Sequence, residues 1–335
     1  TQMDFGFDAS FLNNRLTGTF DWYRRNTKDM LVAGATLPAT LGASVPKSNS
    51  ADMKTIGWEL SLGWNDRLEN GFSYWVKGVL SDYQATITKY AGNDAGFYSQ
   101  SDGDGKYYVG QKIGEIWGYH SNGLFQSDDE AATIDQSELY AGKWGAGDVK
   151  YEDLDNDGKI TKGEETIYNP GDKSIIGNKT PRYQFGITVG FDYKNFDFEM
   201  FWQGTGKRDY MLSGAQFWGF TSQWDVPYTP ALDYWTETNT DAYFPRPGWQ
   251  NGGNRVTSDR YLQSAAYGRL KNLTVGYTIP KNLTTKWGIS RLRLYVTGEN
   301  LLTITPLNDA FDPETLGGMT YPINRKVAIG LNLTL

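Results

Sequence analysis

The sequence lacks cysteine altogether and has one histidine, His120, among 335 residues. The lack of cysteine excludes a disulfide scaffold but does not decide between the cytosol and a cell envelope. With a single imidazole, we expect no Ser-His-Asp, Cys-His or histidine-rich metal site to be assembled within this chain. The sequence therefore predicts no catalytic residues and no enzyme.

Long hydrophobic runs and basic clusters are also missing. No apolar stretch approaches the roughly 20 residues that a membrane helix needs, so a membrane interpretation has to rest on strands. The 32 lysines and arginines face 39 aspartates and glutamates, a net charge of -7. Without a basic cluster to follow phosphates, nucleic acid is not an expected partner. The chain also opens without a signal peptide, which indicates a mature or truncated start.

What the sequence does contain is a recurring alternation of apolar and polar residues. Aromatic residues make up 15% of the chain, a share that suits β-strands. Ile56, Trp58 and Leu60, for example, alternate with Gly57 and Glu59, which predicts a two-faced strand. Nine strands are predicted, over residues 4–11, 16–23, 56–65, 72–89, 185–194, 196–202, 273–279, 292–296 and 327–335. The predicted fold class is therefore all-β.

Three features favour a transmembrane antiparallel β-barrel over a soluble sandwich, in which strands also alternate. Several strands reach about ten residues or more, enough to cross a bilayer at a tilt. The connections alternate between short and long, as periplasmic turns and long extracellular loops do. The short ones are 13–14, 66–71, 194–195 and 280–289, and the long ones 28–54, 90–181, 207–260 and 303–324. Aromatics gather near strand ends, as in interfacial girdles: Trp22, Tyr23, Trp58, Trp64, Tyr74, Trp75, Tyr193 and Trp202.

The same alternation of connections indicates which end of each strand faces outward. If 303–324 is extracellular, the last strand ends at the periplasm, but the first strand then begins outside. Single-chain bacterial barrels have an even number of strands and both ends in the periplasm. We therefore interpret residues 1–335 as the C-terminal part of a larger barrel, about nine strands of it, with the upstream strands absent from this chain.

The longest predicted loop, 90–181, contains one sharp ligand motif. Residues 153–164 match the twelve-residue EF-hand calcium loop at each diagnostic position, including Gly158 at the sharp turn and Ile160 as an apolar anchor. The expected ligands are Asp153, Asp155, Asp157, Lys159 through its carbonyl, Thr161 and Glu164. An acidic solvated turn is the plainer alternative. Because helical flanks are missing, we expect a structural Ca²⁺ that rigidifies the extracellular loop.

Several segments resemble one family, the SusC/RagA-type TonB-dependent outer-membrane transporters. The most specific are SDRYL at 258–262, GRLKNLTVGYTIP at 268–280, LRLYVTGENL at 292–301 and FDPE at 311–314. The ending 321–335 and the run GEIWGYHSNGLF at 114–125, with Gly147 and Asp148 leading into the acidic loop, are also similar. The resemblance spans most of the chain.

This resemblance implies a whole protein of the bacterial outer membrane, with a barrel of about 22 strands around an N-terminal plug. It further implies energy from TonB and a SusD-like surface lipoprotein as a lid for imported oligosaccharides or peptides. The plug and the TonB-contacting segment are absent from this chain, so the remainder of the barrel and the plug are expected partners, besides the lipid bilayer. The calcium-loop positions are the only site residues carried over.

Two other readings compete with this one. The first is a secreted, calcium-stapled, carbohydrate-binding β-sandwich whose apolar faces pack on each other. The second is a barrel hydrolase, which the single histidine disfavours. Loop aromatics offer generic stacking surfaces for sugars or for packing among loops: Trp117, Tyr119, Phe125, Trp218, Trp224, Trp235, Tyr243 and Trp249.

Overall fold

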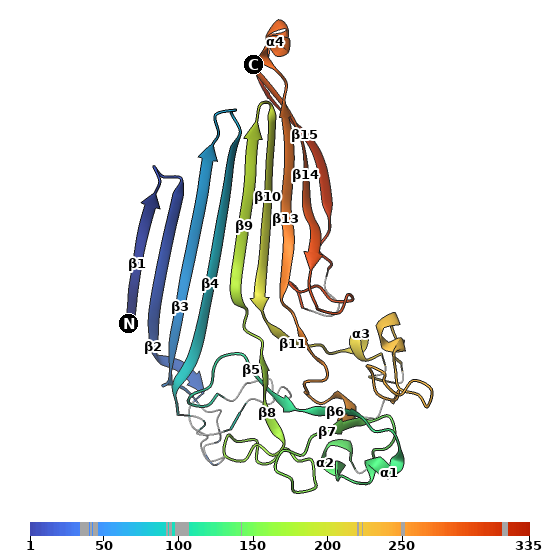
Figure 1. The fold of residues 1–335 in the computed structure, drawn as a ribbon. Coiled ribbons are helices and arrows are strands. Elements are labelled where there is room, and N and C mark those ends of the chain that lie inside the picture. Colours follow the sequence, from blue (N-terminus) through green and yellow to red (C-terminus); the bar gives the residue numbers. More distant parts are fainter. Residues whose placement is uncertain are drawn as a thin grey trace.

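The computed structural model is dominated by one sheet of nine long strands (Figure 1). It describes residues 1–33, 40, 42, 46–91, 93, 96–97, 107–141, 143–219, 221–222, 224–248, 252–316 and 321–335, so Trp249 lies outside the described residues. All eight strand pairs are antiparallel, and the strands follow the order β1-β2-β3-β4-β9-β10-β13-β14-β15. Each strand therefore pairs with the next long strand in sequence.

Each of the nine strands overlaps one of the nine predicted ones, and most extend beyond the predicted bounds. They are β1 (Gln2–Phe11), β2 (Leu16–Ala33), β3 (Lys47–Arg67), β4 (Ser73–Tyr90), β9 (Arg182–Tyr193), β10 (Phe196–Lys207), β13 (Tyr267–Thr278), β14 (Arg291–Ile304) and β15 (Lys326–Thr334). The prediction of a long connection over 28–54 is wrong in its bounds, because β2 and β3 remain paired as far as Ala33 and Lys47. Register shifts between Thr27 and Leu31 interrupt the simple alternation there, which hid the strand ends from the sequence pattern.

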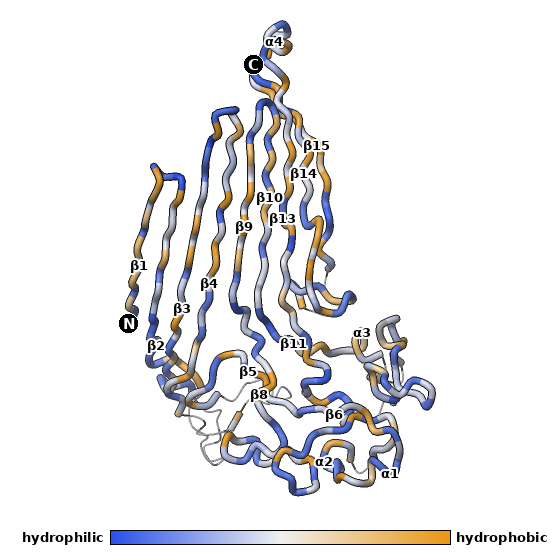
Figure 2. Tube along the Cα trace, in the orientation of Figure 1, coloured by the Kyte–Doolittle hydropathy of each residue, from blue (hydrophilic) through white to orange (hydrophobic). Residues whose placement is uncertain are grey.

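One face of the sheet carries the apolar side chains and leaves them uncovered. Phe5 is 67% exposed, Leu62 49%, Val296 47% and Ile329 82%. Figure 2 shows the hydrophobic and hydrophilic residues alternating along the strands. In a sandwich these faces would be packed against a second sheet. The arrangement excludes the sandwich reading for this sheet and is that of a barrel wall whose outer face meets lipid.

The other face combines polar residues with aromatics that lie over cross-strand glycines. A Cβ atom on Gly57 would lie 2.5 Å from Tyr23, one on Gly190 2.2 Å from Trp75, and one on Gly330 2.3 Å from Tyr295. Each glycine thus leaves room for a ring to lie flat on the neighbouring strand. Aromatic residues that cover glycines on adjacent strands help to fix strand register.

The long connections fold together at one end of the sheet, which we call the loop end; the opposite end is the turn end (Figure 1). The loop end contains β5 (Glu115–Tyr119), β6 (Ser121–Leu124), α1 (Asp128–Ala131), α2 (Ser137–Tyr140), β7 (Val149–Tyr151), β8 (Lys173–Asn178), β11 (Asp209–Met211), α3 (Ala215–Trp218), η3 (Thr229–Leu232), η4 (Gly252–Arg255) and β12 (Leu262–Ser264). Three two-stranded sheets form, β5-β8, β6-β7 and β11-β12. No helix in the described part is long and apolar enough to cross a membrane.

The principal hydrophobic core lies in these loops. Phe217, Tyr261, Leu212 and Val149 are fully buried, and the cluster around them draws only on residues between Tyr119 and Leu316. Phe217 alone contacts the rings of five aromatic neighbours: Trp218, Tyr243, Phe244, Tyr261 and Phe311. The connections therefore form an ordered body with its own core, which we call the loop body.

Short connections join the strands at the turn end. The first hairpin turns through Leu12, Asn13 and Asn14, all with positive φ, and Lys194 takes a positive φ in the turn between β9 and β10. The fourth connection is longer and contains α4 (Lys281–Thr284) and η5 (Thr285–Trp287). Short turns and long loops thus lie at opposite ends, as the sequence predicts.

Candidate functional site in the loop body

Three carboxylates meet in the acidic loop, and they come from two stretches of sequence. Oxygen atoms of Asp153, Asp155 and Asp172 all lie within 4.8 Å of one another. Asp153 and Asp155 belong to the predicted calcium loop, whereas Asp172 lies outside the frame 153–164, directly before β8. Sequence reasoning missed Asp172 because the motif fixes its last ligand at the twelfth position.

The first part of the loop has the turns that the motif requires. Asp153 accepts hydrogen bonds from the backbone N–H groups of Asn156 at 2.6 Å and Gly158 at 2.8 Å. Asp157 accepts one from the Lys159 N–H at 2.8 Å. Gly158 has a φ of +82°, a left-handed conformation that glycine adopts without strain. The backbone therefore winds around the Asp153 carboxylate.

Asp172 holds the loop from inside the protein. Its side chain is fully buried and accepts hydrogen bonds from the N–H groups of Leu154 at 2.8 Å and Thr161 at 2.7 Å. Burial raises the pKa of this carboxyl, and the two N–H donors oppose that shift. Ile160, 1% exposed, anchors the same loop in the core, as the motif predicts. The chain returns to Asp172 through Gly163 and Gly171, whose backbones lie too close for any side chain.

Of the predicted carboxylate ligands, Asp157 and Glu164 are not gathered with these three. Glu164 is exposed, and its N–H donates to the Asn169 carbonyl at 3.0 Å. Asp157 lies outside the three-carboxylate group. Three converging carboxylates, with carbonyl oxygens available along the same loop, are the hard oxygen donors that Ca²⁺ prefers. The donor set of Asp153, Asp155 and Asp172 therefore fits this ion, and Glu164 is not part of the set.

A buried aspartate, Asp148, joins several segments of the loop body. Asp148 has no exposed surface and accepts hydrogen bonds from Gly145 N–H at 2.9 Å and from the Asn254 side chain at 2.9 Å. The Arg246 guanidinium lies 3.2 Å from the same carboxylate. Asn254 in turn accepts hydrogen bonds from the Tyr140 hydroxyl and the Val149 N–H. One carboxylate thus joins segments that are far apart in sequence.

The expectation that one histidine leaves no Ser-His-Asp arrangement is wrong. His120 Nδ1 lies 2.7 Å from an Asp259 carboxylate oxygen, and its Nε2 lies 2.7 Å from the Ser174 hydroxyl. A triad needs only one imidazole, and its partners here lie 139 and 54 residues away in the chain, beyond any local motif. Ser174 is paired with Gly118 inside the β5-β8 ladder, and the nucleophile of an α/β-hydrolase instead occupies a sharp, exposed turn.

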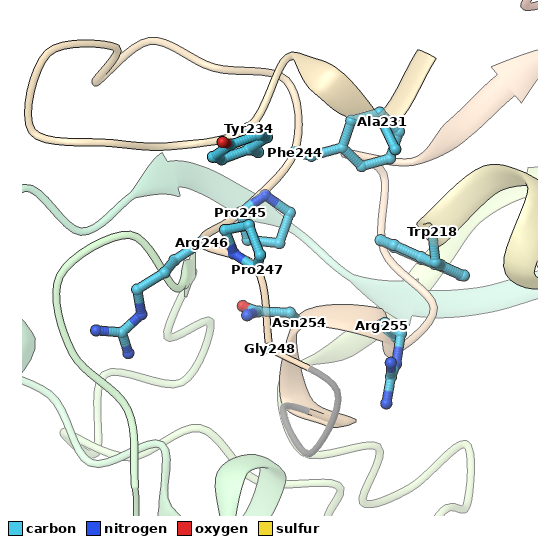
Figure 3. Close-up of a pocket in the computed structure, with 10 residues that line it drawn as sticks. All are labelled: Trp218, Ala231, Tyr234, Phe244, Pro245, Arg246, Pro247, Gly248, Asn254 and Arg255. Atoms are coloured by element: carbon cyan, nitrogen blue, oxygen red, sulfur yellow. The ribbon is translucent and has the colours of Figure 1, made fainter. Parts of the chain in front are cut away.

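A small aromatic pocket lies beside the Asp148 network (Figure 3). Trp218, Tyr234 and Phe244 line it together with Arg246 and Asn254, around a small hollow that opens to solvent. The guanidinium groups of Arg246 and Arg255, another lining residue, point away from each other in Figure 3. Burial lowers the pKa of Arg255. Among the loop aromatics singled out from the sequence that the structure describes, only Trp218 lines this pocket.

The segment 224–232, which supplies Ala231 to this pocket, presents large apolar side chains to solvent. Trp224 is 83% exposed, Val226 77%, Tyr228 47% and Leu232 61%. We call these four residues the 224–232 patch. Large apolar residues gathered on a protein surface mark interaction sites. By contrast, Trp117, Tyr119, Phe125, Trp235 and Tyr243 pack within the loop body.

Comparison with known proteins identifies the relatives of this chain. It is 29% identical to TonB-dependent receptor P3 of Formosa agariphila and 26% identical to TonB-dependent receptor SusC of Bacteroides thetaiotaomicron. Both alignments cover 99% of this chain. The chain is homologous to TonB-dependent receptors. It spans about a third of the length of these relatives, 34% and 31%. No family model matches the sequence.

Solved structures share its fold. The RagAB peptide importer in the open-open state superposes with a TM-score of 0.75 at 22% identity, over 100% of this chain and 34% of that one. These comparisons confirm the SusC/RagA-type resemblance, the transmembrane antiparallel barrel as the fold class and the bacterial outer membrane as the location.

Proposed function

We propose that this chain forms the C-terminal side of the wall, and the loop body, of an outer-membrane TonB-dependent importer. The observation that carries the proposal is the nine-stranded sheet with an exposed apolar face beneath an ordered loop body. The remainder of the barrel would pair with the edge strands β1 and β15. The plug and the contact with TonB would come from the part of the relatives' length that this chain does not span.

We propose oligosaccharides or peptides as the substrate class. The SusC/RagA-type resemblance of the sequence implies both, and a structural neighbour is a peptide importer. Aromatic faces and guanidinium groups such as those of Trp218, Tyr234 and Arg246 suit both classes.

Energy-dependent uptake by the full-length protein tests this proposal. Cells that express it as their only transporter of this type should accumulate a fluorescent oligosaccharide or peptide from a panel of both classes. Accumulation should stop when TonB is deleted, with the amount of receptor in the outer membrane unchanged. Uptake that continues without TonB would overturn the proposed energised import.

We further propose that a SusD-like lipoprotein covers the loop end through the 224–232 patch. A variant with Trp224→Ser and Val226→Ser should lose most of the lipoprotein that copurifies with the full-length protein, because the partner would lose two exposed apolar contacts. Tyr168→Ser is the matched control, since Tyr168 is 82% exposed elsewhere in the loop body. Equal recovery of the lipoprotein with both variants would contradict this assignment.

A structural Ca²⁺ in the acidic loop is proposed as the cofactor, held by Asp153, Asp155 and Asp172 with carbonyl oxygens of the same loop. The support is the match of 153–164 to the calcium motif together with the convergence of the three carboxylates. The ion would cancel the repulsion among them. An affinity on the order of 10⁻⁴–10⁻³ M would be enough outside the cell.

Two substitutions separate the ligand set seen in the structure from the one the motif predicts. Asp172→Asn should weaken Ca²⁺ binding about tenfold or more, measured by calorimetry on the full-length protein, and should speed proteolysis within 90–181. Glu164→Gln should leave both unchanged if Asp172 holds the final position, and the exposed Asp129→Asn is the control. Wild-type affinity in Asp172→Asn would refute this ligand set. Wild-type affinity in Asp153→Asn would refute the site.

We propose that the chain is not an enzyme and that His120 links loop segments. Asp259 also accepts the Ser121 N–H at 2.9 Å, so the three side chains connect β6, β8 and the segment before β12. The full-length protein should hydrolyse a p-nitrophenyl ester no faster than its Ser174→Ala variant. Ester hydrolysis that is lost in both Ser174→Ala and His120→Ala would overturn this proposal.

A further inference from the structure

The connection between β13 and β14 differs from the other short turns of the sheet. It contains α4 and η5, which project past the ends of the long strands on the side away from the loop body (Figure 1). Leu283 is 48% exposed and Trp287 68% exposed. Leu283 lies in α4 and Trp287 ends η5, so both exposed apolar side chains belong to the same connection. The described residues leave most of the Trp287 side chain uncovered.

The segment is held in shape by its own hydrogen bonds. The N–H groups of Leu283 and Gly288 donate to the Pro280 and Thr285 carbonyls at 2.9 and 3.2 Å, and the Ile289 N–H donates to the Thr284 carbonyl at 3.2 Å. Thr284 is fully buried beneath the turn. The apolar side chains are thus presented on a preformed support, and ordering them on a surface costs little conformational entropy.

The charge of the segment indicates what that surface is. Between positions 280 and 291 there are three basic residues, Lys281, Lys286 and Arg291, and no acidic one. The segment also continues directly from the apolar outer face of the sheet, since Leu294 and Val296 on β14 are 44% and 47% exposed. Tryptophan and lysine together at the edge of an apolar band are typical of the membrane interface, where rings meet acyl chains and cations meet phosphates.

We propose that the α4-η5 turn is an anchor in the phospholipid headgroup layer at the turn end of the wall. Leu283 and Trp287 insert among the acyl chains, and Lys281 and Lys286 contact lipid phosphates. This inference rests on the membrane placement of the sheet under the proposed function. The anchor fixes the depth of β13 and β14 relative to the bilayer.

Site-directed spin labelling tests the anchor, because this chain has no native cysteine. The full-length protein, with any cysteine outside this chain replaced by serine, is placed in vesicles of phosphatidylethanolamine and phosphatidylglycerol. A label at Trp287→Cys should collide several-fold more often with oxygen than with a water-soluble nickel chelate, relative to a label at Tyr168→Cys. Val296→Cys on the outer face reports the lipid environment itself.

The outcomes separate the anchor from the membrane placement. The anchor is overturned if the label at Trp287→Cys collides with the nickel chelate as often as the label at Tyr168→Cys while the label at Val296→Cys is in lipid. If the label at Val296→Cys also collides with the chelate, the membrane placement of the sheet fails. Shielding of Trp287→Cys only after a periplasmic extract is added identifies a protein partner and also overturns the anchor. The double substitution Lys281→Glu with Lys286→Glu should raise the access of the chelate to the label at Trp287→Cys, whereas Lys281→Arg with Lys286→Arg should not. Equal effects of the two double substitutions would refute the phosphate contacts.

Discussion

Asp148 shows how a single buried side chain can organise several connections. It lies at the meeting point of Gly145, Arg246 and Asn254 and has no exposed surface. Two of its donors, Arg246 and Asn254, lie 98 and 106 positions away in the chain, so the closing of long loops depends on it. A buried acceptor that satisfies several donors leaves all of them unpaired when it is removed.

We therefore expect Asp148→Ala to destabilise the loop body by about 1–3 kcal/mol, because Asn254 and the Gly145 N–H would lose their acceptor. Hydrogen exchange of the full-length protein should show faster exchange in β7 and η4, with the long strands unchanged. Asp241→Ala, at an exposed position, is the control. Wild-type protection in Asp148→Ala would show that the network does not hold these segments together.

Glycines under aromatic rings are a second feature at the residue scale. A Cβ atom on Gly190 would lie 2.2 Å from the Trp75 ring, whereas one on Gly78 would meet nothing within 4 Å. Gly190→Ala should therefore lower stability by about 1–3 kcal/mol through displacement of the indole, and Gly78→Ala should not. The unfolding midpoints of the two variants are compared by urea titration in detergent, with the heat-dependent shift in gel mobility as the measure of folded protein. Equal midpoints would mean that the ring moves without cost.

At the scale of elements, strands were easier to predict than loops. Alternation identified all nine long strands, because one face meets lipid and the other does not. It failed near Ala33 and Lys47, where register shifts break the period. In the loop body the calcium frame located Asp153 and Asp155 but not Asp172, and nothing local indicated that Ser174 and Asp259 meet His120. Those contacts depend on long-range folding, which periodicity does not encode.

The two faces of one strand should respond differently to the same substitution. Val296 points to the outer face, whereas the hydroxyl of its neighbour Thr297 lies 2.9 Å from that of Thr274 on the polar face. Val296→Arg should cost about 2–4 kcal/mol near the bilayer midplane, and Thr297→Arg much less. Unfolding in phospholipid vesicles measures both. A larger loss from Thr297→Arg would reverse the assignment of the two faces.

At the scale of the whole molecule, the sheet and the loop body have different sources of stability. The sheet has hydrogen bonds and cross-strand contacts but an uncovered apolar face, which gains its stabilisation from lipid. The loop body has its own buried cluster centred on Phe217, Tyr261 and Phe244. Regions with separate cores open with separate free energies. Damage to the loop core should therefore leave the wall intact.

Phe217→Ala tests this separation directly. Phe217 is fully buried and contacts five aromatic rings, so its truncation should destabilise the loop body by about 3–5 kcal/mol. Protease should then cleave within 207–260 in intact outer membranes, while the heat-dependent gel shift of the barrel persists. Tyr168→Ala, at a site outside 207–260 that is 82% exposed, serves as the control. If the gel shift and the resistance of 207–260 to protease were lost together, the wall and the loop body would unfold as one unit. The ends of β10 and β13 would then depend on the aromatic cluster that joins them.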